Sequence, residues 1–401
     1  MDIRIVKNSQ GLCSKSLYKG YVLQTKEVDS EYSNIKRVSY YLYDFEKNES
    51  VEIEPTIKKY NLINVKDIKF QSEFVYFTSI KENDNDNGDI TIILYRYHII
   101  KKETVIVYQF VEKLEKYNEY MRTRIFAVNE YYLFIQNEYL RANLTEDYVD
   151  YFDYELSMYS INESKLYKVN DENLNHYGII DFEPVTSNIC VLKQGFNLLK
   201  DDRYKILKKS EAAMESVSFI NIGQMVSDIL IGQQSLVMDT IENVYYTATI
   251  PYVKVEDGYV IYSKVKLEGK LEEEIVFYNF AKKESFMCIN GSMGETAKIA
   301  RTCIIDKQPC IILDKQNGYE LIDISEQKND MILEGDNKIE YIKDNIMIVS
   351  AKTKSLFGKL KSYIMVYKLP TMKMLHREKG SFVACTLLLG EKLYIMTNRE
   401  K

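Results

Sequence analysis

Carboxylates and tyrosines alternate over residues 146–154, and this segment is the part of the sequence best equipped for chemistry. Three aspartates recur at intervals of three residues, and a tyrosine follows each of them. Aromatic rings stack on sugars, carboxylates bind hydroxyl groups, and glycoside hydrolysis requires a pair of carboxylates. The pattern predicts a site for a sugar or another small polar ligand at Asp147, Tyr148, Asp150 and Tyr151. The alternative is an exposed loop that continues into a Tyr-rich strand.

A second polar stretch, residues 81–89, resembles the start of a calcium-binding loop. Asn83, Asn85 and Asn87 alternate before a glycine, as oxygen ligands do in an EF-hand. The twelfth position of such a loop needs a bidentate acid, and here it is Leu94. We therefore interpret this stretch as an exposed hairpin loop and predict no metal site.

Basic residues gather at Lys352, Lys354, Lys359 and Lys361, around the apolar segment 356–358. A basic loop with an aromatic tip could contact phosphate groups or a membrane surface. Four lysines are too few for either function, and acidic and basic residues are interleaved through most of the chain. We interpret the loop as solvated and expect the protein to bind neither nucleic acid nor a membrane.

The three histidines, His98, His176 and His376, are far apart in the sequence, which argues against a structural zinc site. We expect His98 to be exposed beside a turn. No nucleophile elbow and no phosphate-binding glycine motif occurs, so we predict no cofactor. The cysteines are scattered and are expected to be buried thiols of a reducing compartment, which predicts a cytoplasmic protein. They are Cys13, Cys190, Cys288, Cys303, Cys310 and Cys385.

The elements that position these residues are revealed by a recurring phrase of eight residues. It occurs as Tyr43–Ser50, Tyr97–Thr104 and Tyr278–Ser285, with a shorter copy at Tyr159–Ser164. In each copy an apolar run enters, a charged turn follows and a second apolar run leaves. The phrase predicts a β-hairpin that is used repeatedly.

A shift of the first copy by 54 positions aligns two further apolar runs, so each unit is predicted to hold four strands. The second unit is expected at 67–71, 74–80, 89–98 and 104–110, and the third at 122–128, 131–136, 152–160 and 165–169. Later hairpins are expected at 321–328 and 366–373, preceded by strands at 309–313 and 346–350. Between the copies of the phrase at Tyr159 and Tyr278, a weaker unit is expected with strands at 177–182 and 188–192 and a hairpin at 197–206.

Units of four antiparallel strands resemble the blades of β-propeller proteins, although the dipeptides of WD40 repeats and the paired glycines of kelch repeats are missing. The resemblance concerns the fold alone and transfers no functional residue. It implies an all-β propeller of seven or eight four-stranded antiparallel blades. Strands from both termini, at 3–6, 382–388 and 392–396, are expected to share the closing blade.

Residues 210–231 depart from the β pattern and are expected to form one helical insertion. Apolar residues from Ile222 to Leu230 follow helical spacing. Asn221 is expected to cap this helix with Gln224 completing the cap, and Gly232 is expected to end it.

The composition indicates a folded protein of 401 residues, with 46% hydrophobic residues and a net charge of -6. No linker is visible, so residues 1–401 are expected to form a single β-propeller domain. Because no catalytic motif occurs, we expect a non-enzymatic binding or scaffold propeller, a monomer that engages a protein partner. The alternative is an enzyme that acts on a carbohydrate or a small polar ligand in the central funnel.

Overall fold

The computed structural model describes most of the chain as β-strands. The described residues are 1–8, 12–18, 21–28, 37–52, 68–71, 73–82, 89–112, 118–143, 149–169, 177–184, 187–194, 214–232, 239–245, 253–266, 272–290, 298–316, 318–326, 328–334, 337–354, 360–380 and 382–398. The chain divides into two compact units, one of residues 62–295 and one of residues 1–61 with 296–401. Each unit is described by itself, and the single domain over 1–401 stays a prediction.

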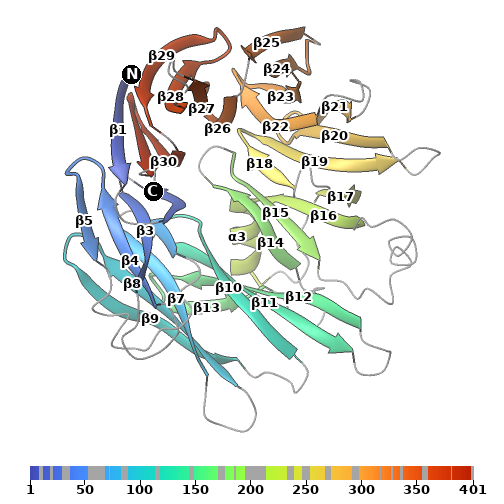
Figure 1. Ribbon diagram of the computed structural model, residues 1–401. Helices are drawn as coiled ribbons and strands as arrows, with labels where there is room; N and C mark the ends of the chain where they lie inside the picture. The colour runs from blue at the N-terminus through green and yellow to red at the C-terminus, as the bar shows by residue number, and fades with distance from the viewer. Residues whose placement is uncertain are drawn as a thin grey trace. The chain divides into compact units, whose positions relative to one another are not determined.

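The unit of residues 62–295 holds four sets of four antiparallel strands (Figure 1). The first two sets are β6 (Ile68–Gln71), β7 (Phe74–Glu82), β8 (Ile90–His98) and β9 (Glu103–Glu112), then β10 (Asn118–Ala127), β11 (Tyr132–Asn143), β12 (Val149–Ser160) and β13 (Lys165–Lys168). The next two sets are β14 (Tyr177–Glu183), β15 (Ile189–Gln194), β16 (Met214–Asn221) and β17 (Asp239–Tyr245), then β18 (Lys254–Glu256), β19 (Tyr259–Lys266), β20 (Glu272–Asn279) and β21 (Glu284–Asn290). A short pairing of β17 with β19 joins these last two sets.

The other unit holds three such sets and a smaller sheet. The sets are β2 (Leu12–Tyr18), β3 (Tyr21–Val28), β4 (Arg37–Asp44) and β5 (Glu49–Glu52), then β22 (Lys298–Ile305), β23 (Gln308–Lys315), β24 (Gly318–Asp323) and β25 (Lys328–Glu334), then β26 (Asn337–Lys343), β27 (Ile346–Lys354), β28 (Leu360–Lys368) and β29 (Lys373–Lys379). The smaller sheet has the order β1 (Asp2–Asn8), β31 (Lys392–Asn398), β30 (Phe382–Leu389). In it β1 is parallel to β31, and β31 is antiparallel to β30.

These sheets confirm the predicted all-β propeller. In the described ranges there are seven four-stranded antiparallel blades, and strands from both ends of the sequence share the three-stranded sheet. The second and third units and both late hairpins lie where the sequence predicted them. The predicted hairpin at 197–206 lies outside the described residues.

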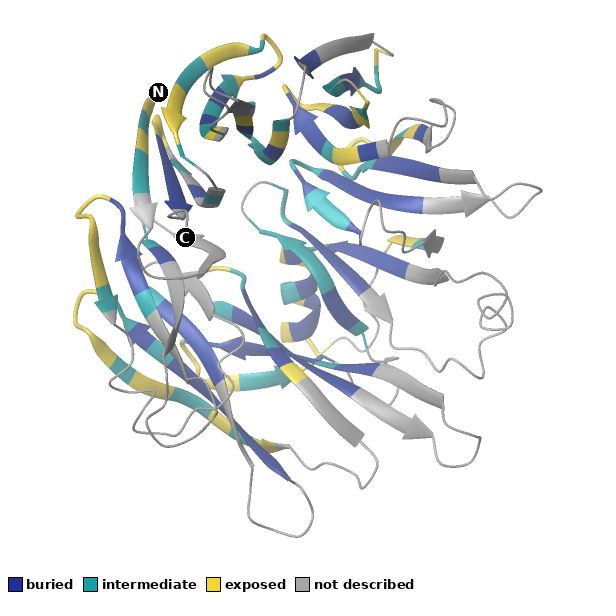
Figure 2. Ribbon diagram, viewed as in Figure 1, coloured by how far each residue is buried: buried dark blue, intermediate teal, exposed yellow. Residues whose placement is uncertain are grey.

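Most buried residues lie on the strands inside each sheet, whereas the outermost strands carry many of the exposed ones (Figure 2). Strand β8 shows why, because it has β9 on one side and β7 on the other and is buried along almost its whole length. Four of the six cysteines, Cys190, Cys288, Cys303 and Cys310, are buried as expected. Burial raises the pKa of the Cys310 thiol to about 12.

The recurring phrase has a physical basis in the turn that it forms. Its second residue caps the turn, because Asp44 Oδ1 accepts hydrogen bonds from the backbone N–H groups of Glu46 (2.9 Å) and Lys47 (3.1 Å). The corresponding acceptors in other copies are His98, Ser160, Asn279 and Asp323. The sixth residue of the phrase takes a left-handed backbone, with φ between 51° and 58°. These residues are Asn48, Lys102, Ser164 and Lys283, and in the later hairpin at 366–373 Met372 takes the same backbone conformation.

His98 flanks its turn as predicted, but the expectation that it is exposed is wrong. Its side chain is 16% exposed, and its ring packs edge-on against Phe74 with centroids 5.0 Å apart. The ring nitrogen Nδ1 accepts from the Lys101 N–H at 3.4 Å. This hydrogen bond keeps the imidazole beside the turn.

The predicted helix is present, but the insertion is shorter than 210–231. Helix α3 spans Ile222–Leu230, and residues 214–221 form β16, the third strand of its blade. The sequence pattern misled here because Val217 and Phe219 are buried together with Ser218 and Ile220, so the strand shows no alternation. Helix α3 therefore lies between the third and fourth strands, where the other blades place their hairpin turn.

The predicted N-cap of α3 and its end at Gly232 are present, whereas the Gln224 side-chain amide donates along the helix to Asp228 Oδ1 at 2.7 Å. The Asn221 side chain accepts from the Gln224 N–H, and Gly232 has φ +72°. Ile222, Met225 and Ile229 pack into a core that also contains Phe134. No helix in the described ranges is long and apolar enough to cross a membrane.

The left-handed turn residue yields a first prediction. Replacing Lys102 with Val should destabilise the fold by about 1–2 kcal/mol, because a β-branched residue strongly disfavours this backbone region. Replacing it with Gly should leave stability unchanged or raise it. Urea unfolding of both variants measures the effect, with Lys101→Val as the matched control. Equal stability of the Val and Gly variants at position 102 would contradict the assignment.

Candidate functional site

The structure locates part of the predicted ligand site. Asp147 and Tyr148 lie outside the described residues. Asp150 and Tyr151 lie in β12, in register with Ala142 and Arg141 of β11. The ligand site at these four positions stays a prediction.

The other candidate segments are also only partly described. Asn83, Asn85, Asn87, Lys359 and His176 lie outside the described residues. Lys352 lies in β27 and Lys361 in β28, so they belong to a hairpin of strands. The ring of His376 lies 3.4 Å from the Glu378 carboxylate on β29. Among the described residues, no group of three or more potential ligands could hold a metal ion.

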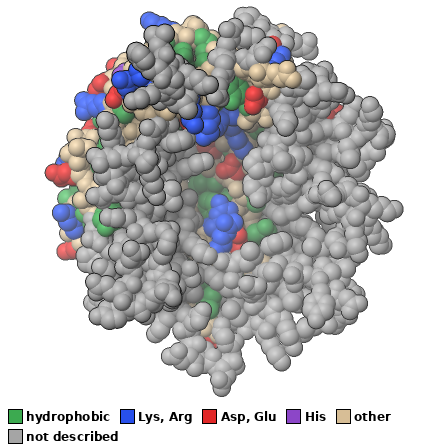
Figure 3. Space-filling view, viewed as in Figure 1, with side chains coloured by type: hydrophobic (Ala, Val, Ile, Leu, Met, Phe, Trp, Pro, Cys, Tyr) green, Lys and Arg blue, Asp and Glu red, His purple; other side chains and the backbone are tan. Residues whose placement is uncertain are grey.

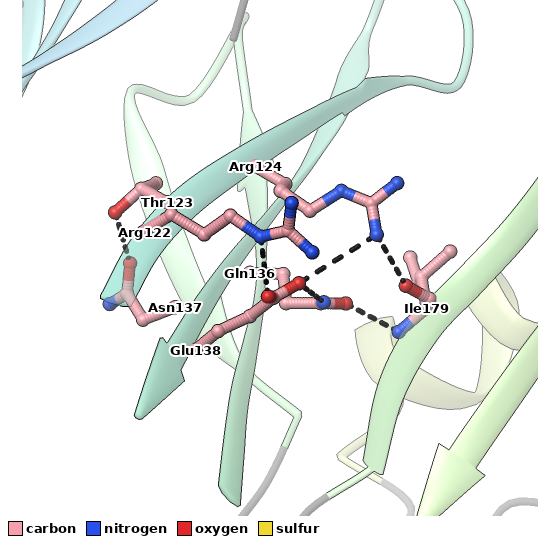
Figure 4. Close-up of polar contacts among 7 residues, drawn as sticks. All are labelled: Arg122, Thr123, Arg124, Gln136, Asn137, Glu138 and Ile179. Carbon is pink, nitrogen blue, oxygen red and sulfur yellow. Dashed lines mark hydrogen bonds and ion pairs between the residues drawn. The ribbon is translucent and has the colours of Figure 1, made fainter. Parts of the chain in front are cut away.

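A polar cluster that the sequence did not predict lies on β10 and β11 (Figure 4). Two arginines of β10, Arg122 and Arg124, point toward the carboxylate of Glu138 on β11. Arg122 Nε lies 2.5 Å from Glu138 Oε2, and Arg124 Nη1 lies 3.7 Å from Oε1. Gln136 donates from Nε2 to Oε1 at 2.8 Å. The carboxylate is thus held from three sides.

The strand register explains why these residues meet. Arg122 is directly opposite Glu138, and Arg124 is directly opposite Gln136. Because side chains alternate along a strand, all four project from the same face of the sheet. Thr123 and Asn137 form the pair between them on the other face, where the threonine hydroxyl donates to the amide oxygen at 2.7 Å.

The cluster also binds the next blade. The Ile179 N–H of β14 donates to Gln136 Oε1, and Arg124 Nη1 donates to the Ile179 carbonyl at 3.4 Å. Ile179 lies at an irregularity in the pairing of β14 with β15, where backbone groups leave the regular ladder. The two side chains therefore satisfy both backbone groups of Ile179.

Asp181 makes the corresponding link to the following blade. Its carboxylate accepts from the Val255 N–H of β18 at 2.5 Å and from the Phe182 N–H at 2.8 Å. Burial raises the pKa of the Asp181 carboxyl above its ordinary value, although both hydrogen bonds act in the opposite direction.

The electrostatics of the cluster favour an anion. Two guanidinium groups and one carboxylate give a net charge of about +1. Glu138 and Gln136 are buried, whereas the side chains of Arg122 and Arg124 are 51% and 27% exposed. The guanidinium carbon of Arg124 also lies 4.8 Å from the centroid of the Phe126 ring, a cation–π contact. Such a fork matches the geometry of a carboxylate or a phosphate.

On the face drawn in Figure 3, described basic side chains lie beside acidic ones. The sequence signal for the cluster was the spacing Arg-x-Arg on one strand followed by Gln-x-Glu on the next. Strands were predicted at 122–128 and 131–136, but no role was predicted for their polar residues.

No protein-family model matches this chain. No curated protein matches it either. Among solved structures, it is similar to dipeptidyl peptidase 4 of Porphyromonas gingivalis, with a TM-score of 0.50 and 12% identity over 89% of this chain and 50% of that chain. It is also similar to an acylaminoacyl peptidase of Pyrococcus horikoshii (TM-score 0.45, 11% identity, 90% of this chain and 52% of that chain). A third match is the β-propeller domain of the Trilobed protease of Pyrococcus furiosus (0.43, 7%, 93% and 96%).

These comparisons correct the functional expectation. The sequence favoured a non-enzymatic scaffold, with a carbohydrate-active enzyme as the alternative. The matched structure with a TM-score of 0.50 is a peptidase, and this chain spans about half of its length. A pure scaffold is therefore not supported.

Removing the Gln136 side chain should destabilise the fold. Gln136→Leu leaves the Ile179 N–H and the Glu138 carboxylate without this buried partner, which costs about 1–3 kcal/mol for each unsatisfied group. The exposed Gln316 provides the matched control, Gln316→Leu. Urea unfolding compares the two, and equal stability would show that the bonds to Ile179 and Glu138 contribute nothing.

Asp181 predicts a pH dependence. Because its folded-state pKa is raised, the folded protein binds this proton more tightly than the unfolded chain does. Stability should therefore fall as the pH rises from about 4 through the raised pKa. Asp181→Asn lacks this proton, so its stability should fall less over the same range. Unfolding free energies of both proteins, measured at several pH values, test this, and parallel curves would refute it.

Proposed function

We propose that this chain is the peptide-binding propeller of a peptidase system, in which Arg122 and Arg124 bind a carboxylate of the peptide. The observation that carries the proposal is the pair of arginines on one face of β10, oriented by the buried residues Gln136 and Glu138. A separate hydrolytic part cuts the peptide in this proposal. The likeness to a peptidase of about twice the length supports that division.

The geometry favours a carboxylate for a physical reason. Within the described residues, the polar contacts given for Arg124 are made through Nη1. Its guanidinium also carries the donors Nε and Nη2 in the same plane, which can donate to a ligand. Both guanidinium groups face the single Glu138 carboxylate, so the cluster holds two basic groups and one acidic group. Because Glu138 and Gln136 are fixed by packing, the arginines are oriented before the peptide arrives, which lowers the entropic cost of binding.

Fluorescence anisotropy tests the proposal with an N-terminally labelled alanine peptide, once with a free C-terminal carboxylate and once amidated. The free acid should bind at least about tenfold more tightly, as expected for one charge-assisted hydrogen bond. A third, amidated peptide with an internal glutamate distinguishes a side-chain carboxylate from a chain terminus.

Arg124→Gln should remove most of the preference for the acid. Arg124→Lys should restore only part of it, because an ammonium lacks the planar fork. Arg4→Gln is the matched control, since the half-exposed Arg4 is likewise paired with a carboxylate, that of Asp2 at 3.0 Å. Equal affinity for acid and amide in the unmodified protein would refute the proposed function.

A further inference from the structure

Gly178 of β14 lies against the ring of Tyr154 of β12, in the preceding blade. A Cβ atom at position 178 would lie 2.6 Å from Cδ1 and 2.9 Å from Cδ2 of that ring, and closer still to its Cγ. Carbon atoms in favourable contact are about 3.5 Å apart, so the ring occupies the space that any larger residue would need. Both residues are buried. Glycine therefore lets β14 approach β12 more closely than any other residue would.

This contact lies between two parts of the polar cluster. On one side, Tyr154 is directly opposite Glu138 in the pairing of β11 with β12, so their side chains project from the same face. On the other side, Gly178 directly precedes Ile179, whose carbonyl accepts from Arg124 Nη1 at 3.4 Å. The contact between ring and glycine therefore determines how far the Ile179 carbonyl lies from the side chains of the cluster.

We propose that Gly178 and Tyr154 are positioning residues for the carboxylate site, because their contact fixes the direction of Arg124. The inference rests on the proposed function, in which Arg124 binds a carboxylate of the peptide. A side chain at position 178 requires a displacement of about 1 Å to reach ordinary carbon–carbon contact. The bond from Arg124 to the Ile179 carbonyl is already near the upper limit for a hydrogen bond, so such a displacement breaks it. The guanidinium then lacks the acceptor that orients it toward a ligand.

Gly178→Ala tests the proposal in the anisotropy assay with the free-acid and amidated peptides. Its preference for the acid should fall about tenfold, as for the loss of one charge-assisted hydrogen bond. Gly380→Ala is the matched control and should keep the preference. A Cβ atom there would lie 2.8 Å from Ile364 Cδ1, but this atom ends a flexible side chain that can rotate away.

Urea unfolding shows which variants are folded under the assay conditions. A folded Gly178→Ala protein with the preference of the unmodified protein would overturn the inference. An unmodified protein that binds acid and amide equally would instead refute the proposed function, so the two failures are distinguishable.

Variants of Tyr154 test the same contact from its other side. Tyr154→Phe keeps every ring atom that faces Gly178, so it should keep the preference for the acid, whereas Tyr154→Ala should lose it. Combining Tyr154→Ala with Gly178→Ala should cause no further loss, because the added methyl group then meets no ring. Additive losses in the double variant, or a loss in Tyr154→Phe, would contradict the proposal.

Hydrogen exchange of the unmodified protein gives a test that requires no variant. Saturation with the free-acid peptide should slow exchange of the Tyr154 and Gly178 amides, whereas the amidated peptide should not, because the contact joins the two strands at the cluster. Slower exchange at Gly178 without an effect at Tyr154 would show that the ring takes no part in positioning the site.

Discussion

The irregular first strand found in most of the sheets is the constraint on which the packing of neighbouring blades depends. In β2, β10, β14, β22, β26 and β30 the pairing with the second strand shifts register. Such a shift removes backbone groups from the ladder, and leaving one buried and unsatisfied costs about 1–3 kcal/mol. In both units a side chain of the preceding blade supplies a partner. Gln136 and Arg124 bind Ile179 in one unit, and Arg301 binds the carbonyls of Ile339 and Glu340 in the other.

This constraint links stability to the candidate site. Arg124 holds β14 through the Ile179 carbonyl, and the same guanidinium faces the Glu138 carboxylate. Its direction is therefore determined by the requirement to satisfy a backbone group, and not by a ligand. A binding site built on such a side chain is pre-organised, because the orientation of the arginine is already fixed by the fold. Asp181 and Arg301 show that side chains which bind the backbone of the next blade recur, whereas the two neighbouring arginines lie on β10.

The features that could be predicted from the sequence are those in which the interacting residues are close along the chain. The hairpin phrase was visible because the cap at Asp44 and the left-handed residue Asn48 lie within one turn. The cap of α3 at Asn221 was visible for the same reason. The bond from Gln136 to Ile179 joins residues 43 positions apart, and that from Asp181 to Val255 joins residues 74 apart. Hydrogen bonds between residues so far apart in the sequence leave no local sequence pattern. The blades could therefore be predicted, but the polar cluster could not.

The three-stranded sheet shows how chain direction decides pairing when a blade is incomplete. In the four-stranded blades each strand is antiparallel to the next, so the outermost strand runs opposite to the first. Strand β1 is parallel to β31, and β31 is antiparallel to β30, so β1 also runs opposite to the first strand of its sheet. It therefore has the direction of a fourth strand, although it occupies the third position. That direction lets the chain continue from β1 into β2 as other outermost strands continue into the next blade. In the described ranges this sheet has no strand between β31 and β1. Because β1 has the direction of a fourth strand but lies directly beside β31, the two strands pair in parallel.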